Sequence, residues 1–256
     1  MQECTSVMRE LGLSPKHSLG QNFLVDERVI AREVEYADLS QNDVVLEVGP
    51  GLGFLTRELA KRAGKVVAVE LSRPFYEYLK GQEWDNVELV QGDILKAELP
   101  GYNKVVSNIP YQISSPLTFK LLEKGFELAV LIYQREFADR LVAEPGSKDY
   151  SRLTVAVDYY ADVEVLEVVP RSVFHPRPKV DSAMVRLSPR KPEYHVESID
   201  MYFQLLRDLF SHRRKTIEKC LKLGDYPVPK NANLRKRVGV LSPAEIATLA
   251  NQIYRL

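Results

Sequence analysis

The chain has 256 residues, of which 45% are hydrophobic and 27% are charged, and its formal net charge at pH 7 is zero. This composition is typical of a soluble globular protein, long enough for one large domain and a small one. No apolar run approaches the roughly 20 residues of a membrane-spanning helix, so we expect no membrane partner.

The placement of cysteine and histidine bears on compartment and on metals. Cys4 and Cys220 lie far apart with no Cys-x-x-Cys spacing, which favours reduced thiols over a disulfide or a metal site. The N-terminus has no basic stretch followed by the apolar run of a secretory signal. The four histidines are scattered along the chain. We therefore expect a cytoplasmic protein with no metal ion.

The zero net charge hides an uneven distribution along the chain. Residues 186–256 carry 14 Lys and Arg against 7 Asp and Glu, whereas residues 1–185 carry 21 against 28. Two interpretations of the basic C-terminal segment stay open, namely an ordinary solvated helical surface or a surface that faces a polyanion.

Residues 1–40 are expected to form a helical extension around a polar loop, and a regular alternation of patterns follows. Short β-rich apolar runs cover 44–48, 66–70, 87–90, 104–107 and 128–133. Helical patterns lie between them, for example at 54–63, 73–81 and 115–124. Continuous apolar strands separated by helices are typical of a parallel sheet covered on both faces. The alternation predicts right-handed βαβ crossovers and a doubly wound α/β fold.

The later part of the sequence predicts the end of the sheet and a second domain. Runs at 153–160, 163–169 and 182–187 are expected to be closing strands at one edge. Helical periodicity resumes at 198–223 and 242–255 after a linker near Pro189. We predict a catalytic domain over residues 1–188 and a small all-helical domain over residues 189–256.

A glycine-rich turn follows the first predicted strand, in the segment Glu47-Val48-Gly49-Pro50-Gly51-Leu52-Gly53. Glycines allow the backbone to turn sharply and to approach a ligand at the carboxyl end of a strand. The spacing differs from the G-x-G-x-x-G of dinucleotide-binding proteins.

Two acidic residues follow the next two strands in order. Glu70 ends the second strand, where it could accept hydrogen bonds from both hydroxyls of a ribose, and Asp93 follows the third, where it could accept from an adenine amino group. Together with the glycine turn, they predict a site for a nucleoside with a non-phosphate tail, namely S-adenosylmethionine.

The tetrad Asn108-Ile109-Pro110-Tyr111 follows the fourth predicted strand. A tetrad of this kind suits the transfer of a methyl group to a planar nitrogen such as adenine N6. Adenine N6 is a poor nucleophile because its lone pair is delocalised into the ring. The Asn side-chain oxygen and a backbone carbonyl fixed by Pro could hold both N–H groups, and the Tyr ring could hold the base. From these residues alone the target could be adenine, cytosine or an amide.

These segments, in this order, resemble the small-subunit ribosomal RNA adenine dimethyltransferases of the KsgA type. The resemblance extends from Gly20 to about Lys222 and becomes less clear after Gly224. The matching segments are Gly20–Leu24, Glu47–Gly53, Glu70, Gly92–Asp93, Asn108–Tyr111, Phe174–Ser182 and Phe210–Thr216. The resemblance implies a Rossmann-like class I S-adenosylmethionine-dependent methyltransferase with a small C-terminal helical domain.

The resemblance also implies a cofactor site without a metal ion. Its expected residues are Asn22, Leu24, Gly49, Gly51, Gly53, Glu70, Asp93 and Asn108. Asn22 and Leu24 are expected to close over the methionine end of the cofactor. Glu70 is expected to hold the ribose and Asp93 the adenine.

For the target base, the resemblance implies a catalytic set made of the tetrad 108–111 and Phe174. Asn108 is expected between the cofactor and the target amine, while Tyr111 and Phe174 are expected to sandwich the adenine. The implied product is two adjacent N6,N6-dimethyladenosines in a hairpin near the 3′ end of small-subunit ribosomal RNA. The implied partner is small-subunit RNA in a pre-30S-type particle. We also expect a monomer, and within the basic helical segment we expect Arg213, Arg214 and Lys215 to contact RNA phosphates.

Three alternatives stay open. The same tetrad serves methyltransferases that act on adenine in large-subunit RNA, although the segments 174–182 and 210–216 favour the small subunit. A second alternative is a non-catalytic assembly factor that binds pre-ribosomes. A third is methylation of an amide or of DNA adenine, for which Asn/Asp-Pro-Pro-aromatic is usual, and Ile109 argues against it.

Overall fold

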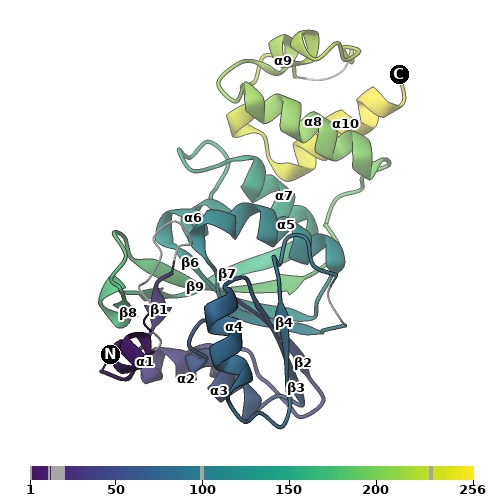
Figure 1. Cartoon of the computed structure of the whole chain (residues 1–256). Helices are drawn as coiled ribbons and strands as arrows, with labels where there is room; N and C mark the ends of the chain where they lie inside the picture. Colours follow the sequence, from purple (N-terminus) through teal and green to yellow (C-terminus); the bar gives the residue numbers. More distant parts are fainter. Residues whose placement is uncertain (1, 11, 13–20, 99–100, 231–232) are drawn as a thin grey trace. The chain divides into compact units, whose positions relative to one another are not determined.

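A computed structural model describes residues 2–10, 12, 21–98, 101–230 and 233–256 (Figure 1). Gly20 and most of the predicted polar loop lie outside these residues. The chain divides into two compact units, Met1–Ala138 with Val163–Pro189, and Asp139–Asp162 with Arg190–Leu256. The second unit therefore contains 139–162, a segment that the predicted domain boundaries assign to the first domain.

The first unit contains a seven-stranded sheet with the strand order β4-β3-β2-β5-β6-β9-β7. The strands are β2 (Val44–Val48), β3 (Lys65–Glu70), β4 (Val87–Gln91), β5 (Lys104–Asn108), β6 (Leu128–Gln134), β7 (Ala161–Val169) and β9 (Ser182–Pro189). Strands β2 to β6 are parallel to their neighbours, whereas β9 is antiparallel to β6. The predicted doubly wound α/β fold is confirmed.

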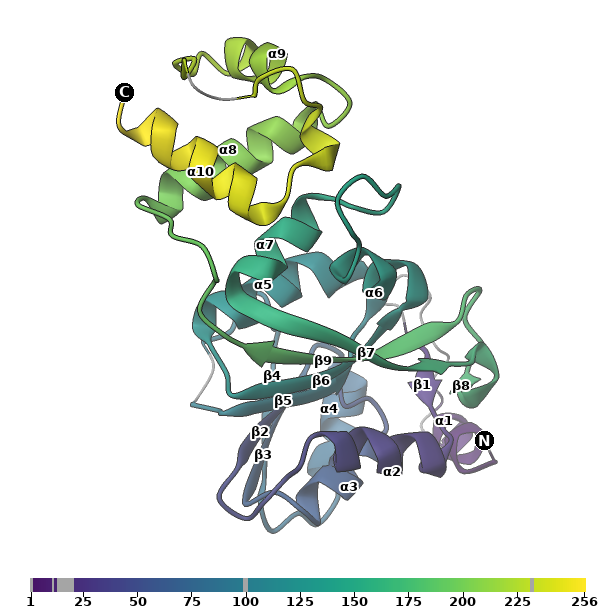
Figure 2. The same ribbon diagram turned by 180° about the vertical axis from the view of Figure 1, so that it is seen from behind.

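Helices cover both faces of this sheet (Figures 1 and 2). They are α2 (Glu27–Tyr36), α3 (Phe54–Ala60), α4 (Arg73–Lys80) and α5 (Ser114–Lys124). On the face that carries α2 and α3, the side chains of Ile30 and Leu59 pack against Val45, Val106 and Val130 of the strands. The central strands are mainly apolar because both of their faces are buried.

Shorter elements flank the sheet. Helix α1 (Gln2–Glu10) places Cys4 and Met8 in a small apolar cluster with Leu52 and Phe75. Strands β1 (Phe23–Leu24) and β8 (Phe174–His175) form a separate antiparallel pair, and the short helices η2 (Tyr111–Ile113) and η3 (Arg171–Val173) lie in loops. Helix α6 (Arg135–Leu141) follows β6.

The predicted strand at 153–160 is wrong, because this segment is helix α7 (Arg152–Tyr160). Its N-terminus has a capping box, in which the Ser151 hydroxyl and the Thr154 hydroxyl each accept from the other residue's backbone N–H. The run from Leu153 to Val157 is wholly buried. A buried helix segment that is apolar on all sides has no amphipathic period, so its sequence resembles a buried strand.

The second unit contains helices α7, α8 (Ile199–Ser211), α9 (Ile217–Leu223) and α10 (Pro243–Tyr254), with the short helix η4 (Val238–Val240) before α10. Helix α8 packs against α7, α9 and α10 and buries Tyr202, Leu205 and Leu209 among them. A capping box formed by Ser242 and Glu245 begins α10. None of the helices in the described part of the chain is long and apolar enough to cross a membrane.

Candidate functional site

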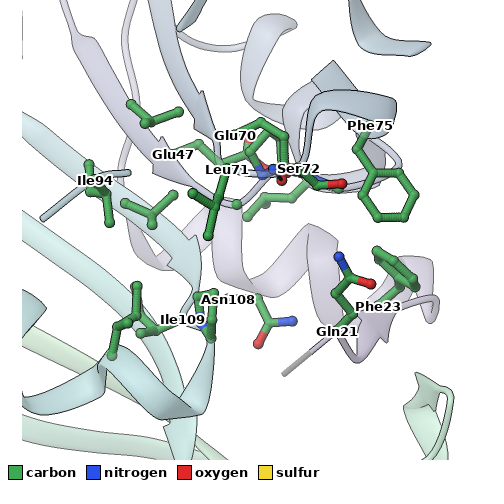
Figure 3. A pocket seen from close by; sticks show the side chains of 18 of the residues that line it. Gln21, Phe23, Glu47, Glu70, Leu71, Ser72, Phe75, Ile94, Asn108 and Ile109 are labelled. Atoms are coloured by element: carbon green, nitrogen blue, oxygen red, sulfur yellow. Dashed lines mark hydrogen bonds between the residues drawn. The ribbon is translucent and has the colours of Figure 1, made fainter. Parts of the chain in front are cut away.

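A cavity of about 200 Å³ lies at the carboxyl ends of the parallel strands (Figure 3). The strand order reverses between β2 and β5, and ligands of open α/β sheets bind outside such a reversal. The lining comprises residues 21–24, 47–52, 54–55, 69–72, 75, 92–94 and 108–113. Most of the predicted cofactor residues and the whole tetrad 108–111 therefore surround one cavity.

A buried serine marks the point where the two central strands separate. Val45 and Leu46 of β2 pair with β5. Nearer the cavity, the Ser107 hydroxyl accepts from the Val48 N–H at 3.1 Å and donates to the Val48 carbonyl at 2.8 Å. The hydroxyl thus satisfies backbone groups that a continued strand ladder would otherwise pair.

The glycine loop takes a backbone conformation that other residues rarely adopt. Gly49, Gly51 and Gly53 have φ angles of 67°, 58° and 79°. A Cβ atom on Gly51 would lie 2.7 Å from a ring carbon of Phe23, so a side chain there would meet the wall of the cavity. Gly53 does not line the cavity, and a Cβ atom on it would instead lie 2.8 Å from the Leu79 side chain of α4.

Glu70 joins the glycine loop to the loop after β3. One carboxylate oxygen accepts from the Gly51 N–H at 3.0 Å, and the other accepts from the Ser72 N–H at 2.7 Å. Burial raises the pKa of Glu70, while these backbone hydrogen bonds oppose the shift. Each carboxylate oxygen can accept a further bond, which matches two hydroxyl donors on a ligand.

Apolar residues that the sequence analysis missed follow the two acids. Leu71 is 53% exposed and, with Ile94, lines the cavity (Figure 3). Asp93 lines the same cavity. Asp93 itself accepts from the Leu95 N–H at 3.0 Å. Leu71 and Ile94 offer apolar contacts to a planar ring. Their position directly after each acid is the signal that could have identified them.

Asn108 lies on the opposite side of the cavity from Glu70, and its side chain has a defined orientation (Figure 3). Its amide nitrogen donates to the Asn22 carbonyl at 3.2 Å, which leaves the amide oxygen as the group that can accept from a ligand. Next to it, Ile109 is buried and its N–H donates to the Ile132 carbonyl. The Pro110 carbonyl accepts from the Ile113 N–H, which closes the turn that holds the tetrad.

The structure separates the two aromatic residues of the predicted sandwich. Tyr111 lines the cavity, but Phe174 is only 2% exposed and packs in the core with Leu24. Leu24 and Phe174 are directly paired in the β1–β8 ladder, and directly paired residues point to the same face. Both side chains are buried, but only Leu24 lines the cavity, so the predicted stacking wall at Phe174 is absent from this conformation.

The carboxyl groups of Glu33 and Glu47 are also buried, and their raised pKa values were not predicted from the sequence. Burial raises the pKa of Glu47 to about 8, and the nearby charge of Glu70 adds to the effect. Burial and the proximity of Glu47 also raise the pKa of Glu33 well above its ordinary value. A folded chain at neutral pH therefore keeps protons on carboxyl groups that an unfolded chain would release.

Glu47→Gln is expected to flatten the pH dependence of stability. Between pH 4.5 and about 8 the folded chain holds a proton on Glu47 that the unfolded chain has released, so stability falls as pH rises through this window. Each unit of pKa shift corresponds to about 1.4 kcal/mol. Thermal unfolding of the wild type and Glu47→Gln across this window measures the effect. Exposed Glu83→Gln serves as the control, and equal slopes for all three proteins would refute the expectation.

The predicted RNA-contacting residues lie in the second unit, between α8 and α9, and differ from one another. The Arg213 guanidinium donates to the Lys148 carbonyl at 2.7 Å and also to the Ser147 carbonyl. Arg213 is therefore engaged within the unit, whereas Arg214 is exposed and Lys215 is half-buried. In the described part of the chain, no cluster of three His, Cys, Asp or Glu residues could hold a metal ion.

Comparison with known proteins gives consistent matches. A family model described as "Ribosomal RNA adenine dimethylase" matches residues 12–254. A "Probable ribosomal RNA small subunit methyltransferase A" of Thermococcus sibiricus is 52% identical over 218 residues, 85% of this chain and 79% of that protein. The protein of the same description from Thermococcus gammatolerans is 49% identical over 254 residues, 94% of this chain and 90% of its own.

Two solved structures are similar over most of the chain. A dimethyladenosine transferase from Plasmodium falciparum has a TM-score of 0.78 and 30% identity over 91% of this chain and 98% of its own. The 23S rRNA methyltransferase ErmE has a TM-score of 0.68 and 34% identity over 91% of this chain and 100% of its own.

Proposed function

Because the chain belongs to the ribosomal RNA adenine dimethylase family, we propose that it dimethylates N6 of two adjacent adenosines in a hairpin near the 3′ end of small-subunit ribosomal RNA. The observation that carries this proposal is the orientation of Asn108 at the edge of the cavity. Its amide nitrogen is bound to the Asn22 carbonyl, so its amide oxygen is the group presented to a target amine.

S-adenosylmethionine is the methyl donor, and when bound it supplies a methyl group already activated on a sulfonium. The cavity fits its nucleoside. Glu70 offers a carboxylate for the ribose hydroxyls, and Leu71 and Ile94 offer apolar contact to the adenine. Glycine is required at position 51, because its φ is 58° and a side chain there would collide with Phe23.

The chain's own residues act by positioning and desolvation. The Asn108 side-chain oxygen and a backbone carbonyl of the tetrad accept hydrogen bonds from the two N–H groups of adenine N6. These hydrogen bonds help to localise the lone pair on the nitrogen. Tyr111 offers an aromatic face to the target base. The Tyr111 hydroxyl is not a base for the released proton, because burial raises its pKa and its hydroxyl is bound to Ser182. The proton leaves to water.

The second methyl transfer sets a further requirement on the same residues. The monomethylated amine has one N–H fewer, so only one of the two acceptors can still bind hydrogen. The other must lie beside a methyl group. A target base splayed from a loop enters such a pocket at low cost, because it has already lost its pairing partner.

We propose that the RNA partner contacts the basic surface of the second unit. The segment 213–215 runs beside 235–237, since the Val238 N–H donates to the Lys215 carbonyl and the Ile217 N–H donates to the Lys236 carbonyl. Thr216 and Arg237 form an antiparallel bridge. Backbone pairing thus gathers two basic segments into one surface suited to phosphates.

The double variant Arg214→Gln/Lys215→Gln is expected to weaken RNA binding uniformly across sequences. The slope of log K against log salt is negative, and each lost phosphate contact reduces its magnitude by about 0.9 on a duplex. The double variant should therefore reduce the magnitude of the slope by roughly two. Titration of small-subunit RNA at several salt concentrations measures it. Lys61→Gln, on an exposed residue that follows α3, is the matched control. An unchanged slope would remove these residues from the interface.

The proposed function is tested by transfer of labelled methyl from S-adenosylmethionine to purified small and large subunits that lack the modification. Nucleoside analysis should find N6,N6-dimethyladenosine in small subunits. The similarity to ErmE makes large-subunit RNA the second candidate, and product only in large subunits would overturn the proposal. Binding to small subunits without any transfer would instead support the assembly-factor alternative. We propose that the enzyme acts as a cytoplasmic monomer on the pre-30S-type particle during subunit biogenesis.

A further inference from the structure

The hydroxyl of Tyr111 is bound inside the protein and does not act on the cavity. It lies 2.7 Å from the Ser182 hydroxyl, at the first residue of β9. Ser182 is fully buried, whereas Tyr111 is half-buried and lines the cavity. Ser182 therefore contacts Tyr111, a residue of the site, but does not itself line the cavity.

The backbone around Ser182 is held at the start of β9, which lies between β6 and β7 in the sheet. Ser182 is paired with Gln134 in the β6–β9 ladder. The preceding residue, Asp181, accepts from the Arg135 N–H through its carbonyl at 3.0 Å and from the Arg171 N–H through its side chain at 2.9 Å. The Ser182 hydroxyl is thus a fixed point that does not depend on the loop carrying Tyr111.

The backbone of Tyr111 is held by a second set of hydroxyl groups. Its carbonyl accepts from the Ser114 hydroxyl at 3.1 Å, and the Ser114 carbonyl accepts from Thr118 at 2.7 Å. The Thr118 hydroxyl in turn lies 2.7 Å from the buried Tyr133 hydroxyl of β6. The ring of Tyr111 is therefore fixed at both ends, at its backbone by α5 and at its hydroxyl by β9.

We propose that Ser182 is a positioning residue that sets the plane of the Tyr111 ring for the target base. The inference rests on the proposed function, in which that ring stacks on adenine. Without the bond, the ring can rotate about its side-chain torsions, and the base it holds departs from the line of methyl transfer. Small misplacements of a reacting group are costly because most of the catalysis here is positioning.

The experiment compares Ser182→Ala, Tyr111→Phe and the double variant on small subunits that lack the modification. Each single variant should lower kcat by about tenfold for both methyl transfers, with the Kd for S-adenosylmethionine unchanged within about twofold. The double variant should be no worse than Tyr111→Phe, because the two changes remove the same bond. If Ser182 had only a general structural role, Ser182→Ala would instead lower kcat by a similar factor in the wild type and in Tyr111→Phe.

Tyr102→Phe is the matched control, since the buried Tyr102 hydroxyl has no hydrogen-bond partner in the described part of the chain. It should keep wild-type kcat. Wild-type kcat in Ser182→Ala, or multiplied losses in the double variant, would overturn the inference while leaving the proposed function intact. Absence of N6-methylated adenosine with the wild-type protein would overturn the proposed function itself, so the two failures are distinguishable.

Discussion

Asn108→Ala is expected to lower methyl transfer to small subunits by roughly 10²–10³-fold. The variant loses the side-chain oxygen that, in the proposed function, accepts from the target amine. It also loses the donor to the Asn22 carbonyl that orients this oxygen. Single-turnover transfer of labelled methyl measures the loss, and calorimetric titration with S-adenosylmethionine separates it from any change in cofactor binding.

The RNA interface should be unaffected by this change, because the proposed phosphate contacts come from Arg214 and Lys215. The Kd for small-subunit RNA should therefore stay within about twofold of the wild-type value. Asn42→Ala, which removes an exposed amide just before β2, at the opposite end of that strand from the cavity, is the control for the general cost of an Asn→Ala change. Methyl transfer at the wild-type rate by Asn108→Ala would refute the assignment of Asn108.

Gly51→Ala is expected to weaken cofactor binding by at least about tenfold, which corresponds to about 1.4 kcal/mol. The backbone at Gly51 has φ of 58°, which an alanine adopts only with strain. Its Cβ would also lie 2.7 Å from the Phe23 ring, so either the ring or the loop must move. Movement of the loop would disturb the bond from the Gly51 N–H to Glu70.

Calorimetric titration with S-adenosylmethionine measures the effect of Gly51→Ala, and thermal unfolding shows whether the fold survives. Gly101→Ala is the matched control, because a Cβ atom there would meet nothing within 4 Å. If Gly51→Ala bound the cofactor with wild-type affinity, the glycine loop would not be restricted to glycine at position 51, and the expectation would be wrong.

The sheet could be predicted from the sequence because its central strands are buried on both faces. Five continuous apolar runs between polar turns correspond to β2 to β6, with ends displaced by at most about one residue from the observed ones. The same rule produced the error at 153–160, because the buried run 153–157 of α7 is equally rich in apolar residues. Its capping pair, Ser151 and Thr154, is a Ser-x-x-Thr rather than the usual Ser/Thr-x-x-Glu/Gln pattern.

The convergence of the expected cofactor residues on one cavity could be predicted because they lie at the ends of successive parallel strands. Such ends meet at one edge of the sheet, so Gly51, Glu70 and Asp93 converge without further information. Long-range pairings have no such signal. The bond between Tyr111 and Ser182 joins positions 71 residues apart, and the burial of Phe174 depends on its pairing with Leu24.

The basic segment shows a different limit of sequence reasoning. Arg213 and Arg214 are adjacent and chemically identical, yet one guanidinium holds the carbonyls of residues 147 and 148 while the other is exposed. Charge alone does not reveal which arginine is satisfied within the fold. That assignment requires the position of a loop more than 60 residues away in the chain.

The contacts that the cavity offers to a cofactor have a consequence for turnover. Glu70, Leu71 and Ile94 all line the part of the cavity proposed for the nucleoside, which is the part that methyl donor and spent product share. Binding energy from a shared part stabilises both molecules alike. We therefore expect S-adenosylhomocysteine to compete with the donor at comparable concentrations, so that the rate follows the ratio of the two and depends on how quickly the product is removed.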